Sequence, residues 1–143
     1  MYLDDIKKRF ADDLFATECA GIEPVEASDG HSVCKTTIIR NHQNAMGGVM
    51  GGMVFTLCDF AFAVASNGLD EPYTMTLSSS ISFLAQPKGK ILTAEACRIK
   101  DGRHTCFYEV TVTDDTGIII AKAFFNGYKL RYGKADEGKE NKN

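Results

Sequence analysis

The chain has 143 residues, of which 44% are hydrophobic and 24% are charged, as in ordinary globular proteins. Its 16 Lys and Arg against 19 Asp and Glu give a formal net charge of −3, which excludes the strongly basic surface typical of nucleic-acid-binding proteins. No stretch has the length and apolar character of a transmembrane helix or a signal peptide. We therefore expect a cytoplasmic protein with no nucleic-acid or membrane partner.

Length predicts a single domain, which we place at residues 1–132. The last eleven residues, 133–143, hold no apolar side chain larger than that of alanine. Such a segment cannot contribute to a hydrophobic core, so we predict a disordered C-terminal tail.

The first predicted element is an amphipathic helix. Leu3, Ile6, Phe10 and Leu14 follow one another at spacings of three, four and four, which places them in one stripe. Apolar and β-branched residues then flank the turn Ser28-Asp29-Gly30, and this pattern predicts a β-hairpin.

A second helix is predicted over residues 52–67. It is apolar on every side except for Asp59, and it ends at Asn67-Gly68, a pair that often ends helices. A helix of this kind must be buried. Four strands follow at roughly 73–84, 91–100, 104–113 and 118–131, and the turn residues between them predict an antiparallel meander.

Together these elements predict an α+β fold in which an antiparallel sheet wraps around a long buried helix. Such a sheet keeps exposed edges and one open end. Pairing with a second copy covers such edges in many proteins, so we expect a dimer or a higher oligomer.

The cysteines and histidines predict neither a metal site nor a disulfide framework. The five cysteines include no C-x-x-C pair, and the three histidines are scattered along the chain without the spacing of metal ligands. Cys58 lies within the apolar helix, where a thiol normally packs. We expect no metal and no cofactor.

Four glycines lie in the segment Asn44–Asp59, just before and at the start of the buried helix. The N–H groups at a helix start can polarise a carbonyl oxygen, and Gly52 is our candidate oxyanion donor. A phosphate-binding loop is excluded because Met53 and Val54 stand where Lys and Ser or Thr are required. A tight turn without function remains the alternative.

Asp59 is the second candidate, because a carboxylate in an apolar helix is costly unless it is paired, hydrogen-bonded or hydrated. Such a setting suits a nucleophile or a general base. Gly52 and Asp59 are seven residues apart, or about 10 Å along a helix. One reacting group cannot touch both, so we expect a site that combines Gly52 of one subunit with Asp59 of the partner subunit.

The segment from His42 to Asn67 resembles the hotdog-fold acyl-CoA thioesterases of the phenylacetic-acid-degradation type. The matching residues are His42, Asn44, Gly47, Met50-Gly51-Gly52, Phe55, Asp59 and Asn67, and the likeness continues through Ser82-Phe83-Leu84, Pro87, Gly89, 92–96 and Gly102-Arg103. This resemblance implies a hotdog fold, dimers that pair into homotetramers, and metal-free hydrolysis of acyl-CoA.

The same resemblance implies roles for individual residues. Asp59 would attack the thioester or activate water, Asn44 would position that water or the thioester, and Gly52 would polarise the carbonyl. Thr76 matches a hydroxyl beside the acid, and we expect His42 to be structural.

Substrate-binding roles are expected for Met50, Gly51 and Arg103. Met50 stands where many relatives have His, and methionine cannot donate the corresponding hydrogen bond. Arg103 lies at a predicted turn, where its charge could meet the phosphates of CoA.

The sequence thus predicts hydrolysis of a small, medium or aromatic acyl-CoA. A protein that binds or senses acyl-CoA without cleaving it is the main alternative, because Met50 replaces the histidine. A hotdog hydratase is disfavoured because no histidine lies between His42 and His104.

Overall fold

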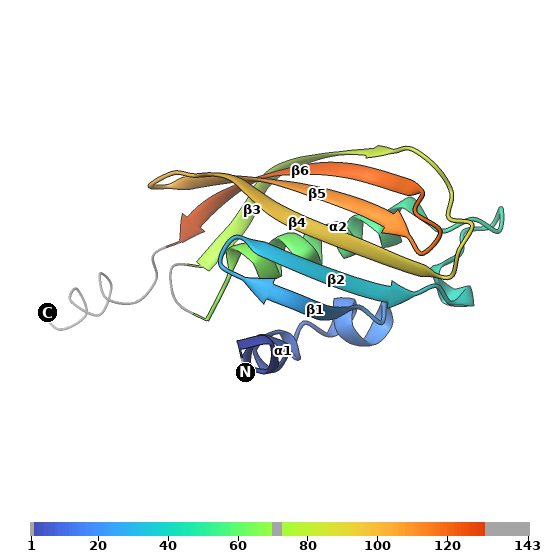
Figure 1. The fold of residues 1–143 in the computed structure, drawn as a ribbon, viewed down its shortest axis with the longest axis horizontal. Coiled ribbons are helices and arrows are strands. Elements are labelled where there is room, and N and C mark those ends of the chain that lie inside the picture. The colour runs from blue at the N-terminus through green and yellow to red at the C-terminus, as the bar shows by residue number, and fades with distance from the viewer. Residues whose placement is uncertain (1, 70–72, 131–143) are drawn as a thin grey trace, which may run out of the picture.

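In the computed structural model, which describes residues 2–69 and 73–130, a six-stranded antiparallel sheet curves around one long helix (Figure 1). The strands are β1 (Glu23–Ser28), β2 (His31–Thr37), β3 (Tyr73–Phe83), β4 (Ile91–Asp101), β5 (Thr105–Asp114) and β6 (Ile119–Leu130). Their order across the sheet is β1-β2-β4-β5-β6-β3. The predicted α+β architecture is confirmed.

The central helix α2 (Gly51–Ser66) packs against the concave face of the sheet (Figure 1). Nine of its 16 residues are buried. The Phe62 ring stacks on Phe125 of β6 with centroids 4.8 Å apart, and it meets Tyr108 of β5 edge-on at 5.2 Å. The apolar character of this helix on all sides is therefore explained by burial, as predicted.

Alternation along the strands separates the two faces of the sheet. In β4, Leu92, Ala94 and Ala96 are fully buried toward α2, whereas Glu95 and Cys97 lie on the outer face. This period of two is the one expected for a sheet with one buried face.

The prediction of a four-strand meander is wrong for β3. Only β4, β5 and β6 form a meander, because β3 pairs with β6 and β4 pairs with β2. The connection 84–90 is long enough to cross the end of the sheet, unlike the short turns after β4 and β5. The Asp114 carboxylate holds this crossing by accepting the N–H groups of Lys88 at 2.8 Å and Gly89 at 2.9 Å.

The N-terminal helix is shorter than predicted. Helix α1 (Tyr2–Phe10) ends before Leu14, whose side chain is 52% exposed. The chain turns after Phe10 and continues as a π-helical turn, η1 (Phe15–Cys19), and a short 3-10 turn, η2 (Arg40–His42), follows β2. The packed stripe therefore ends with the helix, and Leu14 lies outside it.

Helix α2 is the longest helix in the described part of the chain, and no helix there has the combined length and apolar character of a membrane span. The predicted tail, residues 133–143, lies outside the described residues. The domain boundary at residue 132 stays a prediction.

Candidate active site at the start of the central helix

Asn44 shapes the loop that leads into α2. Its Oδ1 accepts the backbone N–H groups of Met46 at 3.0 Å and Gly48 at 3.1 Å. Gly47 lies between them with φ of +84°, a conformation that glycine adopts without steric cost. The Asn44 oxygen is thus committed to the loop, and its amide N–H groups are the part that can serve a ligand.

The start of α2 offers unpaired backbone donors. The carbonyl of Met50, the N-cap residue, accepts the N–H groups of Met53 at 3.0 Å and Val54 at 3.3 Å, and its side chain provides no cap. The preceding N–H groups, of Gly51 and Gly52, have no acceptor within the helix. They lie at the positive end of the helix dipole and can bind a carbonyl oxygen or an oxyanion.

Two cavities flank this helix start. One, of about 240 Å³, is lined by Asn44, Gly51 and Phe83 among others. The other, of about 630 Å³, is lined by Met50 and Gly52 together with residues of η1 and η2. A β-carbon placed on Gly52 would lie only 3.2 Å from the Met50 methyl carbon. Met50 therefore lies directly beside the candidate oxyanion donor.

Gln86 is a residue of this region that the sequence did not single out. Its Oε1 accepts the Val49 N–H at 3.1 Å, and it lines the smaller cavity with Asn44. Nothing in its local pattern distinguishes Gln86 from a solvated glutamine in a loop, because its role depends on the crossing connection between β3 and β4.

Asp59 is partly exposed on α2 and has Thr76 of β3 beside it. Burial of the carboxyl raises its pKa, and the nearby carboxylate of Asp13 raises it further, whereas a hydrogen bond with the Thr76 side chain lowers it. The structure thus brings Asp59 and Thr76 together. Asp13 was missed because it looked like one of several solvated acids near α1.

Asp59 lies outside both cavities at the helix start, two turns of α2 beyond Gly52. The helix rise separates the two residues by about 10 Å. Within one chain, the structure therefore brings Asn44, Met50, Gly51 and Gly52 to one place and Asp59 to another.

A family model described as the thioesterase superfamily matches residues 46–121. The chain belongs to the thioesterase superfamily. The matched region runs from the glycine-rich loop through Asp59 into β6. Family membership makes the chain a thioester hydrolase.

Similar proteins agree with this membership. A curated protein of Archaeoglobus fulgidus named "Putative esterase" is 30% identical over 107 residues, which cover 74% of this chain and 69% of that protein. A hypothetical thioesterase protein of Streptococcus pneumoniae, solved with coenzyme A, is 29% identical with a TM-score of 0.74, covering 87% of this chain and 96% of that one.

Two further solved structures have folds similar to that of this chain. A Streptococcus mutans protein bound to acetyl-CoA is 31% identical with a TM-score of 0.71, covering 77% of this chain and 91% of that one. The Escherichia coli PaaI protein of the phenylacetic acid degradation operon has a TM-score of 0.78 at 22% identity, covering 90% of this chain and 96% of that one. The resemblance found in the sequence and the hotdog fold are confirmed.

His42 is structural in this thioesterase, as predicted. Its ring is buried; Nδ1 accepts the Ile39 N–H at 3.3 Å and Nε2 lies 2.8 Å from the carbonyl oxygen of Ala20. These partners suit a neutral ring with its proton on Nε2. Both ring nitrogens are therefore occupied in holding η2 against the end of η1.

The buried thiols are inert. Burial raises the pKa of Cys58 to about 12, and that of Cys34 to about 12. A thiol in this state supplies almost no thiolate at neutral pH, which agrees with the packing role predicted for Cys58.

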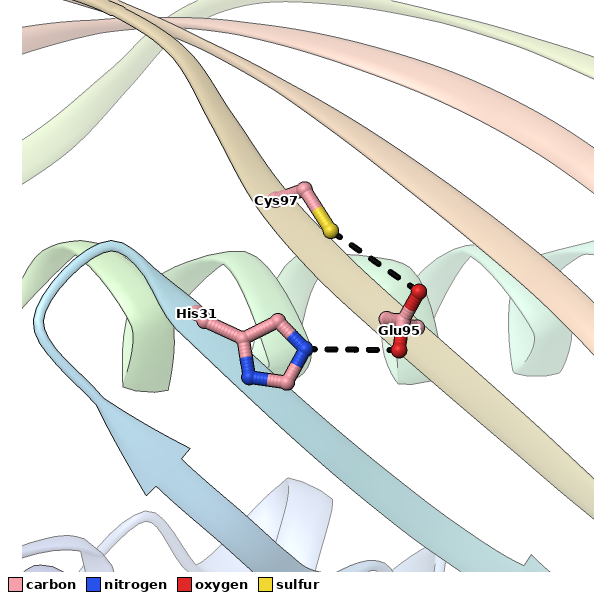
Figure 2. A group of neighbouring side chains, drawn as sticks. All are labelled: His31, Glu95 and Cys97. Carbon is pink, nitrogen blue, oxygen red and sulfur yellow. Dashed lines mark hydrogen bonds and ion pairs between the residues drawn. The ribbon is translucent and has the colours of Figure 1, made fainter.

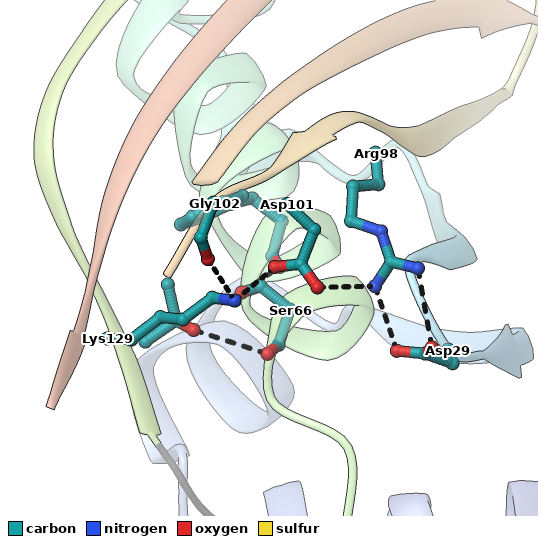
Figure 3. Close-up of polar contacts among 8 residues, drawn as sticks. Asp29, Ser66, Arg98, Asp101, Gly102 and Lys129 are labelled. Atoms are coloured by element: carbon teal, nitrogen blue, oxygen red, sulfur yellow. Dashed lines mark hydrogen bonds and ion pairs between the residues drawn. The ribbon is translucent and has the colours of Figure 1, made fainter. Parts of the chain in front are cut away.

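Arg103 lies apart from the other candidates, at the turn between β4 and β5. Asp101, at the end of β4, lies near Ser66 at the C-terminal end of α2 (Figure 3). A cavity of about 570 Å³ lies at this end, lined by Asp29, Ser66, Arg98, Asp101 and Lys129 among others. Figure 3 shows that these charges pair with one another: Arg98 contacts Asp29 at 3.0 Å and Asp101 at 3.8 Å, and Asp101 also pairs with Lys129.

Proposed function

We propose that the protein is a cytoplasmic acyl-CoA thioesterase that hydrolyses a small, medium or aromatic acyl-CoA to the free acid and CoA. Its membership of the thioesterase superfamily supports this proposal. Similar structures of 29% and 31% identity hold coenzyme A and acetyl-CoA, respectively. The acyl group is the part of the substrate that the cavities beside Gly51 and Gly52 would select.

The active site of this proposal lies between two subunits. Asn44 and the N–H groups at the start of α2 come from one subunit, and Asp59 of the partner subunit supplies the carboxylate. Thr76, which lies beside Asp59, belongs to β3, and β3 is the last strand of the sheet. The carboxylate therefore lies near an edge at which a second copy can pair.

The apolar side chains of β3 support such pairing. An edge strand that exposes large apolar residues favours association. The exposed large apolar side chains on β3 and just after it are Tyr73, Met75, Leu77, Phe83 and Leu84. We propose a dimer through this edge, and pairing of dimers into a homotetramer.

In the proposed reaction, the thioester carbonyl oxygen accepts the Gly52 N–H, and Gly51 lines the approach. With Asp59 as general base, water adds to the carbonyl carbon and gives its proton to Asp59. With Asp59 as nucleophile, the carboxylate attacks the carbonyl carbon first, and water then hydrolyses the anhydride that forms. Either way the C–S bond breaks, the thiolate of CoA leaves and takes a proton, and the acid is released. The N–H groups stabilise the oxyanion that forms before the C–S bond breaks.

Two binding roles complete the proposal. Met50 forms the wall of the larger cavity beside Gly52, where it contacts the acyl group without donating a hydrogen bond. The Arg103 guanidinium meets the phosphates of CoA at the outer end of the substrate.

The observation that carries the proposal is the pair of open helix-start donors in a chain that also holds a carboxylate of raised pKa on the same helix. The test is CoA release over a panel of short, long and aromatic acyl-CoA thioesters. We expect Asp59→Asn to lower kcat by about 100-fold or more, the scale of general-base catalysis. Glu26→Gln, which removes an exposed carboxylate on β1 outside both cavities, is the matched control and should keep full turnover.

Binding of acyl-CoA without cleavage is the second candidate, and it is favoured by Met50 in place of a hydrogen-bonding histidine. Tight binding with no CoA release from any thioester of the panel would select it. Turnover that survives in folded Asp59→Asn would contradict the proposed role of the carboxylate.

A further inference from the structure

A histidine, a glutamate and a cysteine meet on the outer face of the sheet, away from α2 (Figure 2). His31 is the first residue of β2, and it lies directly opposite Cys97 of β4. Glu95 precedes Cys97 by two residues on the same strand and therefore shares its face. His31 is 64 residues before Glu95 in the sequence, and the pairing of β2 with β4 brings it beside the other two residues.

The spacing of the three side chains is close to that of metal ligands. His31 Nε2 lies 3.3 Å from Glu95 Oε2, Cys97 Sγ lies 3.8 Å from Glu95 Oε1, and one ligand atom from each residue lies within 4.8 Å of the others. In a tetrahedral zinc site, bonds of about 2.0 Å to nitrogen or oxygen and about 2.3 Å to sulfur place neighbouring ligand atoms about 3.3–3.6 Å apart.

The backbone that carries the cluster is held on several sides. The register between β2 and β4 is unbroken over seven residue pairs, from His31–Cys97 to Thr37–Ile91. Gly30, just before His31, has φ of +76°, donates its N–H to Ala65 of α2 at 3.1 Å and accepts the N–H of Arg98 at 2.8 Å. Only small side-chain rotations are therefore needed to close the three ligands on an ion.

We propose that His31, Glu95 and Cys97 bind one Zn²⁺ ion on the outer face of the sheet. Imidazole, carboxylate and thiolate are the three kinds of protein ligand that zinc takes, and water completes the tetrahedron. On binding, the Cys97 thiol loses its proton to solvent and the thiolate forms the bond to the metal. The ionised glutamate and the thiolate then balance the charge of the ion.

The charges beside the cluster balance one another, so the Glu95 carboxylate leaves a net negative charge that favours a cation over an anion. Glu109 of β5 lies opposite Cys97 on the same face, and its carboxylate pairs with Lys122 of β6. The His31 and Glu95 side chains are 34% and 56% exposed, so an ion can reach them from solvent. A thiol and an imidazole are poor ligands for Ca²⁺ and Mg²⁺, which separates zinc from these ions.

This site is independent of the proposed thioesterase site. The sheet lies between the cluster and α2, which carries Gly52 and Asp59 on the inner side. Zinc here would tie β2 to β4 and takes no part in the hydrolysis. Its test needs no substrate, so its failure leaves the proposed function untouched.

The test is a calorimetric titration of Zn²⁺ into the full-length, reduced and chelator-treated protein. We expect one ion per chain, no heat with Mg²⁺, and a loss of affinity of about tenfold or more in each of His31→Ala, Glu95→Gln and Cys97→Ser. The matched controls are His104→Ala and Cys19→Ser, which remove another exposed histidine and another exposed cysteine and should keep wild-type affinity.

Replacement of zinc by Co²⁺ reports the sulfur bond directly. The thiolate-to-cobalt absorption band should be present in wild type and in Cys19→Ser, and absent in Cys97→Ser. Thermal unfolding without metal checks that the variants fold. Binding that all three cluster variants retain would show an adventitious ion only. Either that result or no zinc binding by wild type would overturn the proposal.

Discussion

At the scale of single residues, the pKa of Asp59 is set by burial and two neighbours, which act in different directions. Burial and the Asp13 carboxylate raise the pKa of Asp59, whereas the Thr76 side chain lowers it through a hydrogen bond. In the proposed reaction the carboxylate must be ionised, so activity should rise with pH as Asp59 loses its proton. The acid side of the profile of activity against pH therefore reports the pKa of Asp59 in this environment.

Two substitutions should shift that acid side in opposite directions. Asp13→Asn removes a negative charge, so the pKa of Asp59 falls and the acid limb of kcat/KM moves to lower pH. Thr76→Val removes the hydrogen bond that favours the ionised form, so the limb moves to higher pH. The measurement is kcat/KM against pH for both variants beside wild type; shifts in the same direction would contradict this account.

Gly52 should matter through its N–H group rather than through its small size. Gly52→Pro removes the donor without breaking a helix hydrogen bond, because this N–H has no partner within the helix. We expect kcat to fall by about 100-fold or more, the cost of losing one oxyanion donor. The control is Gly52→Ala, whose new β-carbon meets only the flexible end of Met50 and which should retain most of the turnover.

Residue chemistry alone pointed to Gly52 and Asp59, because glycines before a helix and an acid in an apolar helix are unusual patterns, whereas the role of Asn44 came from the family resemblance. The setting of Asp59 could not be predicted in the same way. Asp13 is 46 positions earlier in the chain, and only the turn after α1 brings its charge near Asp59. Contacts of this kind depend on tertiary packing, which leaves no local signal.

At the scale of elements, Asp114 joins the end of β5 to the connection that crosses the sheet. Its buried carboxylate accepts N–H groups of Lys88, Gly89, Thr116 and Ile118, and these bonds hold its pKa well below the usual range. Asp115 adds to this by accepting the N–H groups of Lys90 at 2.7 Å and Ile91 at 3.1 Å, so two adjacent acidic side chains hold the connection between β3 and β4.

Asp114→Asn should therefore destabilise the fold, with an unfolding midpoint several degrees below that of wild type at neutral pH. Because the pKa is lowered in the folded state, the stabilisation is present above the unfolded pKa of about 3.9 and is lost as pH falls through the folded value. Thermal melts at a series of pH values check this. The difference between variant and wild type should be constant above about pH 5 and shrink below it.

The strands were predictable as elements, whereas their order was not. Alternating and β-branched residues predicted β3 to β6 with nearly their observed bounds, and the all-apolar pattern predicted α2. A strand's own residues do not specify its neighbours, however, and β3 carries the same kind of pattern as a strand that pairs with β4. The length of the 84–90 connection was the available sign of a crossing, and the sequence alone gave it no special weight.

At the scale of the whole molecule, the proposed site requires two copies of the chain. Asp59→Ala and a Gly52→Pro variant should each be inactive, yet subunits of the two kinds can combine. A mixed dimer has one site with both residues intact and one with neither. At equal amounts and free exchange, about a quarter of the wild-type sites should be active.

Refolding the two inactive variants together and measuring CoA release checks this arrangement. Each variant refolded alone is the baseline, and size-exclusion chromatography confirms that dimers form. Activity that stays at the baseline in the mixture would place Gly52 and Asp59 in the same subunit or would remove one of them from the site.

The crossing of the chain between β3 and β4 also fixes the order in which the protein can fold during synthesis. Strand β3 leaves the ribosome directly after α2, yet its partner β6 begins 36 residues after β3 ends. Until β6 emerges, β3 has no strand to pair with and the apolar surface of α2 remains partly open. Wrapping of the central helix is therefore a late event, and nascent chains that stop before β6 are expected to be captured by chaperones or degraded.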